Sequence, residues 1–201
     1  MRRIVYALVV VFFIGLTSCR KNSVQPSLNQ NVGGQKTVAG NPDLNQGTGA
    51  NADSALNNVS GYMRLQLTKD SINNDNIFIN FNPAAKTTYY GMEDAPSFQG
   101  FGLVSLASYS SDNVPLAINV LPLTKQGIAI KLRVNASNDG VYKLDMLSIK
   151  TIPDAFDIWL MDNYKKDSLD LRTNHSYAFN IAKSDTASFG SNRFKLAVRK
   201  K

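Results

Sequence analysis

The sequence predicts an all-β protein, an antiparallel β-sandwich of jelly-roll type, with a closed barrel as the alternative architecture. From Gly61 almost to the C-terminus, apolar and polar residues alternate with a period of two, which is the pattern of half-buried strands. Turn-forming residues divide this part into about ten short segments, as in sandwiches and jelly rolls. The 3.6-residue periodicity of an amphipathic helix does not appear in these segments.

Residues 60–201 are expected to form one domain, because a chain of this length can bury a single core. The chain has a single cysteine, Cys19, so none is free to form a disulfide within it and packing must stabilise the fold. In chain order the expected strands lie at 61–68, 77–81, 102–107, 116–120, 128–134, 141–149, 155–161, 169–172, 176–181 and 193–198.

The clearest strand is 128–134, where every second residue is aliphatic and two of the three residues between are cationic. One face of this strand is therefore expected in the core and the other in water. Residues 135–140 contain Asn, Asp and Gly, which favour a tight turn. The next strand, 141–149, again places its large apolar residues on one side. We therefore expect the two strands to form a hairpin.

Residues 1–18 have the features of a lipoprotein signal peptide. Arg2 and Arg3 precede an uncharged apolar run from Ile4 to Gly15. At about 12 residues, this run is shorter than the roughly 20 that a membrane-spanning helix needs. It ends in Leu-Thr-Ser before Cys19, the only cysteine, so we expect a lipobox with Cys19 as the lipidated residue. An ordinary cleaved signal, or a buried structural cysteine, is the alternative.

Residues 19–59 comprise Cys19 and a segment rich in Asn, Gly, Gln and Ser. Apolar residues are too sparse there to offset the entropy of ordering the chain. We therefore expect a flexible tether between the lipid and the domain.

The formal net charge is +7, and it falls to +5 when Arg2 and Arg3 leave with the signal. Several of the remaining basic residues lie near the C-terminus, where they alternate with Phe194, Leu196 and Val198. That alternation indicates a strand rather than a nucleic-acid-binding patch, and we expect no nucleic-acid partner.

Four short motifs carry a resemblance to a known family: "WLMDN" at 159–163, "DLR" at 170–172, "YAF" at 177–179 and "NRFKL" at 192–196. With these motifs, residues 60–198 resemble a β-sandwich module near the C-terminus of many large secreted and surface proteins of the Bacteroidota, often just before a type IX sorting signal. The resemblance implies an extracytoplasmic sandwich without catalytic residues of its own. A lipid on Cys19 would replace the sorting domain as the anchor, in the outer membrane and facing the periplasm or the cell surface.

Candidate catalytic and metal-binding residues are few. His175, the only histidine, lies in a polar turn, and Glu93 and Asp94 are adjacent, so on an extended chain they point to opposite faces. Oxygen donors from Asp70 to Asn76 would suit Ca²⁺, but the spacing lacks the Gly and distal Glu of an EF-hand, and turn formation explains them as well. We expect no catalytic residue, metal site or cofactor.

Four aromatic residues, Tyr89, Tyr90, Phe98 and Phe101, lie in the least patterned part of the domain. Exposed rings there would stack on sugar faces; alternatively, they plug the open end of the sandwich. The sequence thus predicts a non-catalytic binding or structural module, held at the membrane by its lipid, with an envelope protein or glycan as partner. The alternative is an accessory protein or enzyme of envelope glycan processing.

Overall fold

The computed structural model describes residues 56, 58–99 and 102–201, all within the compact unit Asn45–Lys201. The predicted signal peptide (1–18), the predicted lipidation site Cys19, most of the predicted tether (19–59) and Phe101 lie outside the described residues. The described part is nearly all β, which confirms the predicted fold class.

The described residues form eleven strands and one short 3-10 helix. Their bounds are β1 (Gly61–Thr68), β2 (Asn74–Phe81), β3 (Ala95–Pro96), β4 (Val104–Tyr109), β5 (Pro115–Leu121), β6 (Ile128–Ala136), β7 (Gly140–Lys150), β8 (Phe156–Asp162), β9 (Asp167–Asp170), β10 (Ser176–Ile181), η1 (Thr186–Ser188) and β11 (Phe194–Lys200). Among these residues there is no helix long and apolar enough to span a bilayer.

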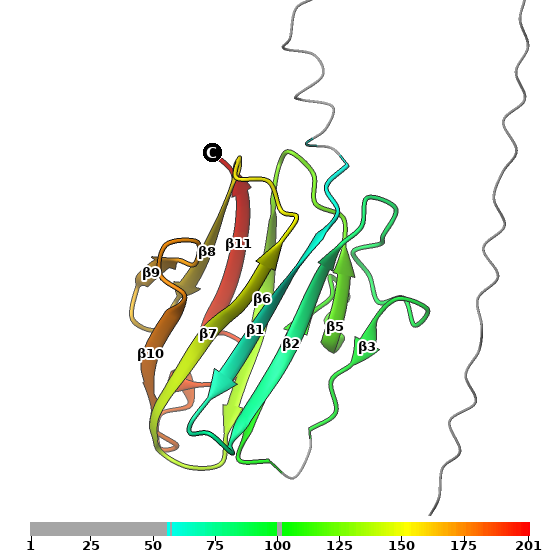
Figure 1. Cartoon of the computed structure of the whole chain (residues 1–201). Coiled ribbons are helices and arrows are strands. Elements are labelled where there is room, and N and C mark those ends of the chain that lie inside the picture. The colour runs from blue at the N-terminus through cyan, green and yellow to red at the C-terminus, as the bar shows by residue number, and fades with distance from the viewer. Residues whose placement is uncertain (1–55, 57, 100–101) are drawn as a thin grey trace, which may run out of the picture. The chain divides into compact units, whose positions relative to one another are not determined.

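The strands make one sheet that folds over into two layers and nearly closes. Their order is β10-β7-β1-β2-β5-β4-β6-β11-β8-β9, with β3 paired to β5. In Figure 1, β7, β1 and β2 lie side by side at the front and β6, β11 and β8 lie behind them. Strands β2 and β5 pair in parallel, whereas the other ladders between the described strands are antiparallel.

The inner faces of both layers contribute to one hydrophobic core. Met63, Leu65 and Leu67 of β1 are at most 1% exposed, and so is Leu132 of β6. Burial of each such side chain stabilises the fold by roughly 1.5–3 kcal/mol. Val59, just before β1, is also buried and forms an isolated bridge with Leu123.

The hairpin expected for residues 128–149 is wrong, because β6 and β7 belong to different layers. Strand β6 pairs with β4 and β11, and β7 pairs with β1 and β10. Residues 137–139 carry the chain across the core, a distance of about 10 Å between packed sheets. Gly140, with φ of 144°, begins the new strand, and the Tyr142 hydroxyl donates a hydrogen bond to the Asn138 carbonyl at 2.7 Å. Both strands can then turn their apolar faces to the same core.

The expected strand at 169–172 begins and ends earlier, as β9 (Asp167–Asp170). Leu171 follows in a turn, where it is fully buried. The Arg172 guanidinium donates to the carbonyls of Ile152, Pro153 and Phe156, at 3.1, 2.8 and 2.7 Å. These bonds hold the turn against the start of β8. Leu171 is therefore buried like a strand residue and continues the apolar–polar alternation, although β9 ends at Asp170.

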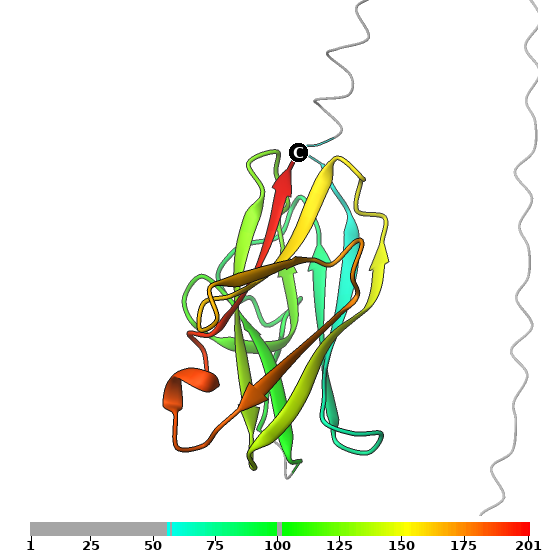
Figure 2. The ribbon, with the colours of Figure 1, turned by 90° about the vertical axis from the view of Figure 1, so that its left-hand side faces the viewer.

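The two end strands of the sheet, β10 and β9, are joined by side chains along a seam. Figure 2 shows the ribbon from the side of these two strands. Arg193, only 1% exposed, lies in this seam. Its Nη1 donates to the Asn180 carbonyl of β10 at 2.7 Å and to the Ser188 carbonyl, and its Nε and Nη2 donate to Asp162 at the end of β8. The guanidinium thus links the end of β8 to β10 and η1.

Tyr177 of β10 completes the seam. Its hydroxyl lies 3.1 Å from a carboxylate oxygen of Asp162 and 3.3 Å from one of Asp167. Burial, together with the negative charge of Asp162, raises the pKa of Tyr177 well above its ordinary value. The phenol therefore remains a neutral hydrogen-bond donor to the buried carboxylate.

Candidate functional site

The connection between β2 and β4 carries the aromatic residues that the sequence singled out. We call residues 82–98 of this connection the aromatic loop. Tyr89 is 38% exposed, Tyr90 41% and Phe98 86%, and Met92 beside them is 83% exposed. The fourth predicted residue, Phe101, lies outside the described residues. The three described rings thus present apolar area to solvent instead of filling the core.

Asp94 fastens the aromatic loop to the sheet. The side chain is 8% exposed. One carboxylate oxygen accepts the backbone N–H of Tyr90 at 2.7 Å, and the other accepts that of Val120 in β5 at 2.8 Å. Since a carboxylate that accepts backbone N–H groups forms charge-assisted hydrogen bonds, Asp94 fixes the turn that displays Tyr90.

Asp112, in the turn between β4 and β5, holds the other tyrosine. Its Oδ1 accepts the Ser110 hydroxyl at 2.6 Å and the backbone N–H of Tyr89 at 2.9 Å. The hydrogen bond from Ser110, followed by that from Tyr89, lowers the pKa of Asp112 below its ordinary value. The carboxylate is therefore ionised at neutral pH, and the backbone at Tyr89 is held in place.

The local surroundings of the two rings differ. The Lys86 ammonium lies 4.4 Å from the centre of the Tyr90 ring, so a positive charge accompanies that aromatic surface. The Tyr89 hydroxyl lies against Gly91, where an added Cβ would be 3.0 Å from it. Flat apolar rings with hydroxyl groups and a nearby cation suit a sugar face, including an acidic sugar.

Glu93 and Asp94 have different environments. Glu93 is exposed, whereas Asp94 is buried and uses both carboxylate oxygens on backbone N–H groups. A glycosidase-like pair needs two carboxyl groups that face a common substrate. In this geometry Asp94 acts as a fastening group for the loop.

The remaining candidates are accounted for by turns. The Asp70 carboxylate accepts hydrogen bonds from the backbone N–H groups of Ile72 and Asn73 and from the Asn73 side-chain amide. The bond from the side-chain amide has the largest effect, and together these bonds lower the pKa of Asp70. The His175 ring Nδ1 is 2.8 Å from the Leu171 carbonyl oxygen. The described residues contain no group of three His, Cys, Asp or Glu side chains that could hold a metal ion.

The sequence singles out Asp94 only as the neighbour of Glu93 in a carboxylate pair and does not single out Asp112, so the fastening role of both aspartates is missed. Asp94 stands two residues before Pro96, and Asp112 stands before Asn113, which adopts a φ of 63°. These are turn signals, but their partners lie 26 and 23 residues away. The turn chemistry was therefore visible in the sequence, whereas its use to fasten a second loop was not.

Comparison with known proteins finds no matching family model, no matching curated protein and no matching solved structure.

Proposed function

We propose that the protein is a lipid-anchored β-sandwich of the bacterial cell envelope that acts as a non-catalytic binding module, with the aromatic loop contacting an envelope glycan. One observation carries this proposal: Tyr89 and Tyr90 are exposed on a loop whose backbone is fastened by Asp112 and Asp94. Because the loop is ordered before a ligand arrives, little conformational entropy is lost on binding.

The proposed cellular location rests on the N-terminal sequence. Arg2 and Arg3, the short apolar run and the lipobox ending in Cys19 support export and lipidation. The resemblance to the Bacteroidota module supports an outer-membrane position, facing the periplasm or the cell surface. The lipid would make the membrane the first partner of the protein, and the tether would place the domain within reach of envelope glycans and proteins.

A glycan array probed with the full chain, purified in detergent, tests the function. We expect weak binding, with Kd near 1 mM or about −4 kcal/mol, since each stacked ring contributes only about 0.5–1.5 kcal/mol beyond its buried area. Tyr89→Ala and Tyr90→Ala should each raise Kd by about 2- to 10-fold. The matched control is Ile72→Ala, because Ile72 is 86% exposed but lies outside the aromatic loop.

Absence of glycan binding, or equal losses in the two tyrosine variants and in Ile72→Ala, would contradict this function. The domain would then be a structural module that contacts another envelope protein.

The alternative, an enzyme of envelope glycan processing, is separated from binding by turnover. Glu93 is the exposed carboxylate beside the two tyrosines, so Glu93→Gln would abolish hydrolysis if the loop were catalytic. We expect glycan binding without product, and the same affinity in the Glu93→Gln variant.

A further inference from the structure

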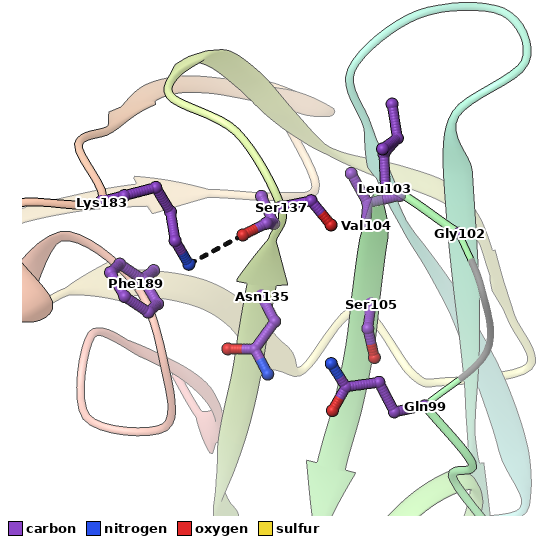
Figure 3. Close-up of a pocket in the computed structure, with 10 residues that line it drawn as sticks. Gln99, Gly102, Leu103, Val104, Ser105, Asn135, Ser137, Lys183 and Phe189 are labelled. Atoms are coloured by element: carbon purple, nitrogen blue, oxygen red, sulfur yellow. Dashed lines mark hydrogen bonds between the residues drawn. The ribbon is translucent and has the colours of Figure 1, made fainter.

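A pocket lies at the start of β4 and the end of β6, and none of the tyrosines of the aromatic loop lines it. It has a volume of about 350 Å³ and is lined by residues of β4, the end of β6 and the connection between β10 and β11, with Gln99 at its border. Figure 3 shows the polar ends of Gln99, Ser105 and Asn135 gathered on the same side of the β4–β6 pair. The volume is at the lower end of the range for small-molecule sites.

Ser105 supplies an unused hydrogen-bonding group in this pocket. The residue is 6% exposed, and its Oγ has no hydrogen-bond partner within the described structure. In the β4–β6 ladder it stands directly opposite Asn135, whose side chain lines the same pocket. A buried hydroxyl without a partner is unfavourable by about 1–3 kcal/mol, so a ligand atom that bonds to Ser105 Oγ removes an existing penalty.

The pocket carries positive charge. Lys183 Nζ donates to the Ala136 carbonyl at 2.9 Å and lies 3.8 Å from the centre of the Phe189 ring. An ammonium group has three N–H donors, so two remain for a ligand. None of the described lining residues is acidic; nearby, Asp139 accepts the backbone N–H of Lys183 at 2.6 Å.

A second cation, Arg133, stands near the pocket but does not line it. It is paired with Ala107 in the β4–β6 ladder, two residues along β4 from Ser105. Its Nε is buried without a partner, and its Nη2 lies 3.5 Å from Ser97 Oγ. Strands β4 and β6 thus bring the unpartnered Ser105 hydroxyl and the Asn135 amide together, and the β10–β11 connection adds Lys183. With Arg133 two residues from Asn135 along β6, this set favours an anion bearing hydroxyl groups.

We propose that this pocket binds a single carboxylate-bearing sugar residue, with the carboxylate at Lys183 and the sugar hydroxyls at Ser105, Asn135 and Gln99. The inference goes beyond the proposed function, because it uses none of the aromatic residues of the aromatic loop. It assigns the domain a recognition site for acidic glycan units.

Isothermal titration of the full chain in detergent with glucuronate tests the site, with glucose and acetate as probes that lack the carboxylate or the ring. We expect a Kd of about 1–10 mM for glucuronate and at least about tenfold weaker binding of the other two. Equal binding of acetate would indicate a simple ion site, and equal binding of glucose would remove the role of Lys183. Either result, or no binding of glucuronate, overturns the proposal.

Two serine variants on the same strand give a matched comparison. Ser105→Ala should weaken glucuronate binding by about tenfold or more while leaving the Tm unchanged or raised, because no internal hydrogen bond is lost. Ser108 is fully buried but bonded to Leu116 and Asn119, so Ser108→Ala should lower the Tm and leave glucuronate binding unchanged. A Tm loss in Ser105→Ala, or unchanged affinity, contradicts the assignment.

Lys183→Gln should remove the preference for glucuronate over glucose. Tyr89→Ala and Tyr90→Ala should leave glucuronate binding unchanged. These variants distinguish failure of the pocket proposal from failure of the aromatic-loop proposal. The Ser105 and Lys183 variants test the pocket through glucuronate binding, and the tyrosine variants test the aromatic loop through binding to the glycan array.

Discussion

Arg193 and Asp162 form an ion pair in which neither side chain is exposed, with 2.9 Å between Nη2 and Oδ2. Removing two charges from water is unfavourable, and the pair is tolerated only when the other polar atoms of both groups are also bonded. Arg193 meets this condition through the carbonyls of Asn180 and Ser188, and Asp162 through the backbone N–H groups of Tyr164 and Lys165.

Breaking this pair should strongly destabilise the fold. We expect Arg193→Met to lower the free energy of unfolding by about 3–5 kcal/mol, because Asp162 is left as an unpaired buried charge. The double variant Arg193→Met with Asp162→Leu should lose less than the sum of the two single changes. Urea denaturation measures both. Lys195→Met, on the outer face of the neighbouring strand, is the control and should change stability by less than about 0.5 kcal/mol.

The stability of the domain should fall in acid because of Asp162. Burial acts to raise the pKa of this carboxyl, but the hydrogen bonds from Arg193 and Lys165 outweigh burial and leave the pKa below 3.8. The stabilisation is therefore fully present above about pH 4, the pKa in the unfolded chain, and is lost as the pH falls through the lower folded value. Urea midpoints measured downward from neutral pH should decrease below about pH 4. The pKa values of Asp70 and Asp112 are also lowered, so the control is the Asp162→Asn variant. An equally steep loss of stability in acid in that variant would show that Asp162 is not responsible.

Leu132 and Lys131, adjacent in β6, should respond very differently to truncation. Leu132 is fully buried, so Leu132→Ala should destabilise by about 2–5 kcal/mol through lost burial and a residual cavity. Lys131 points to the outer face, where its ammonium lies 5.1 Å from the centre of the Tyr109 ring. Lys131→Ala should therefore change stability by less than about 1 kcal/mol. Similar denaturation midpoints for the two variants would mean that the inner and outer faces of β6 are reversed.

Cys19 should carry the lipid. Cys19→Ser should leave an unprocessed precursor, or a soluble form if another peptidase cleaves, because the serine cannot form the thioether to the lipid. Mass spectrometry of the membrane-bound mature protein provides the measurement. A mature chain that starts elsewhere, or an unmodified Cys19, would contradict lipid anchoring.

The strands could be predicted from the sequence because each depends on local alternation. In β6, the buried side chains of Ile130, Leu132 and Val134 are two residues apart, which requires no knowledge of neighbouring strands. The connection after β6 was predicted wrongly for the same reason. Asn, Asp and Gly favour a turn, but they do not determine whether the chain returns beside the strand or crosses to the other layer.

Long-range contacts also limit what the sequence can predict about the functional sites. The exposure of Tyr89 and Tyr90 agrees with their place in an unpatterned segment, whereas the bonds that fasten them depend on Asp112 and Val120, more than twenty residues away. The pocket at Ser105 depends on the register of β4 against β6. A serine in a strand gives no sign of this, since its neighbour is fixed only when the two strands pair.

The seam between β10 and β9 also covers the edges of the sheet. An open sheet edge is a template onto which a strand of another molecule can add. Here Arg193 occupies the Asn180 carbonyl of β10, and β9 at the other end is only four residues long and carries Asp167 and Asp170. A lipid anchor would confine many copies to one membrane plane, where collisions are frequent. The buried arginine would then protect such a crowded layer from edge-to-edge aggregation.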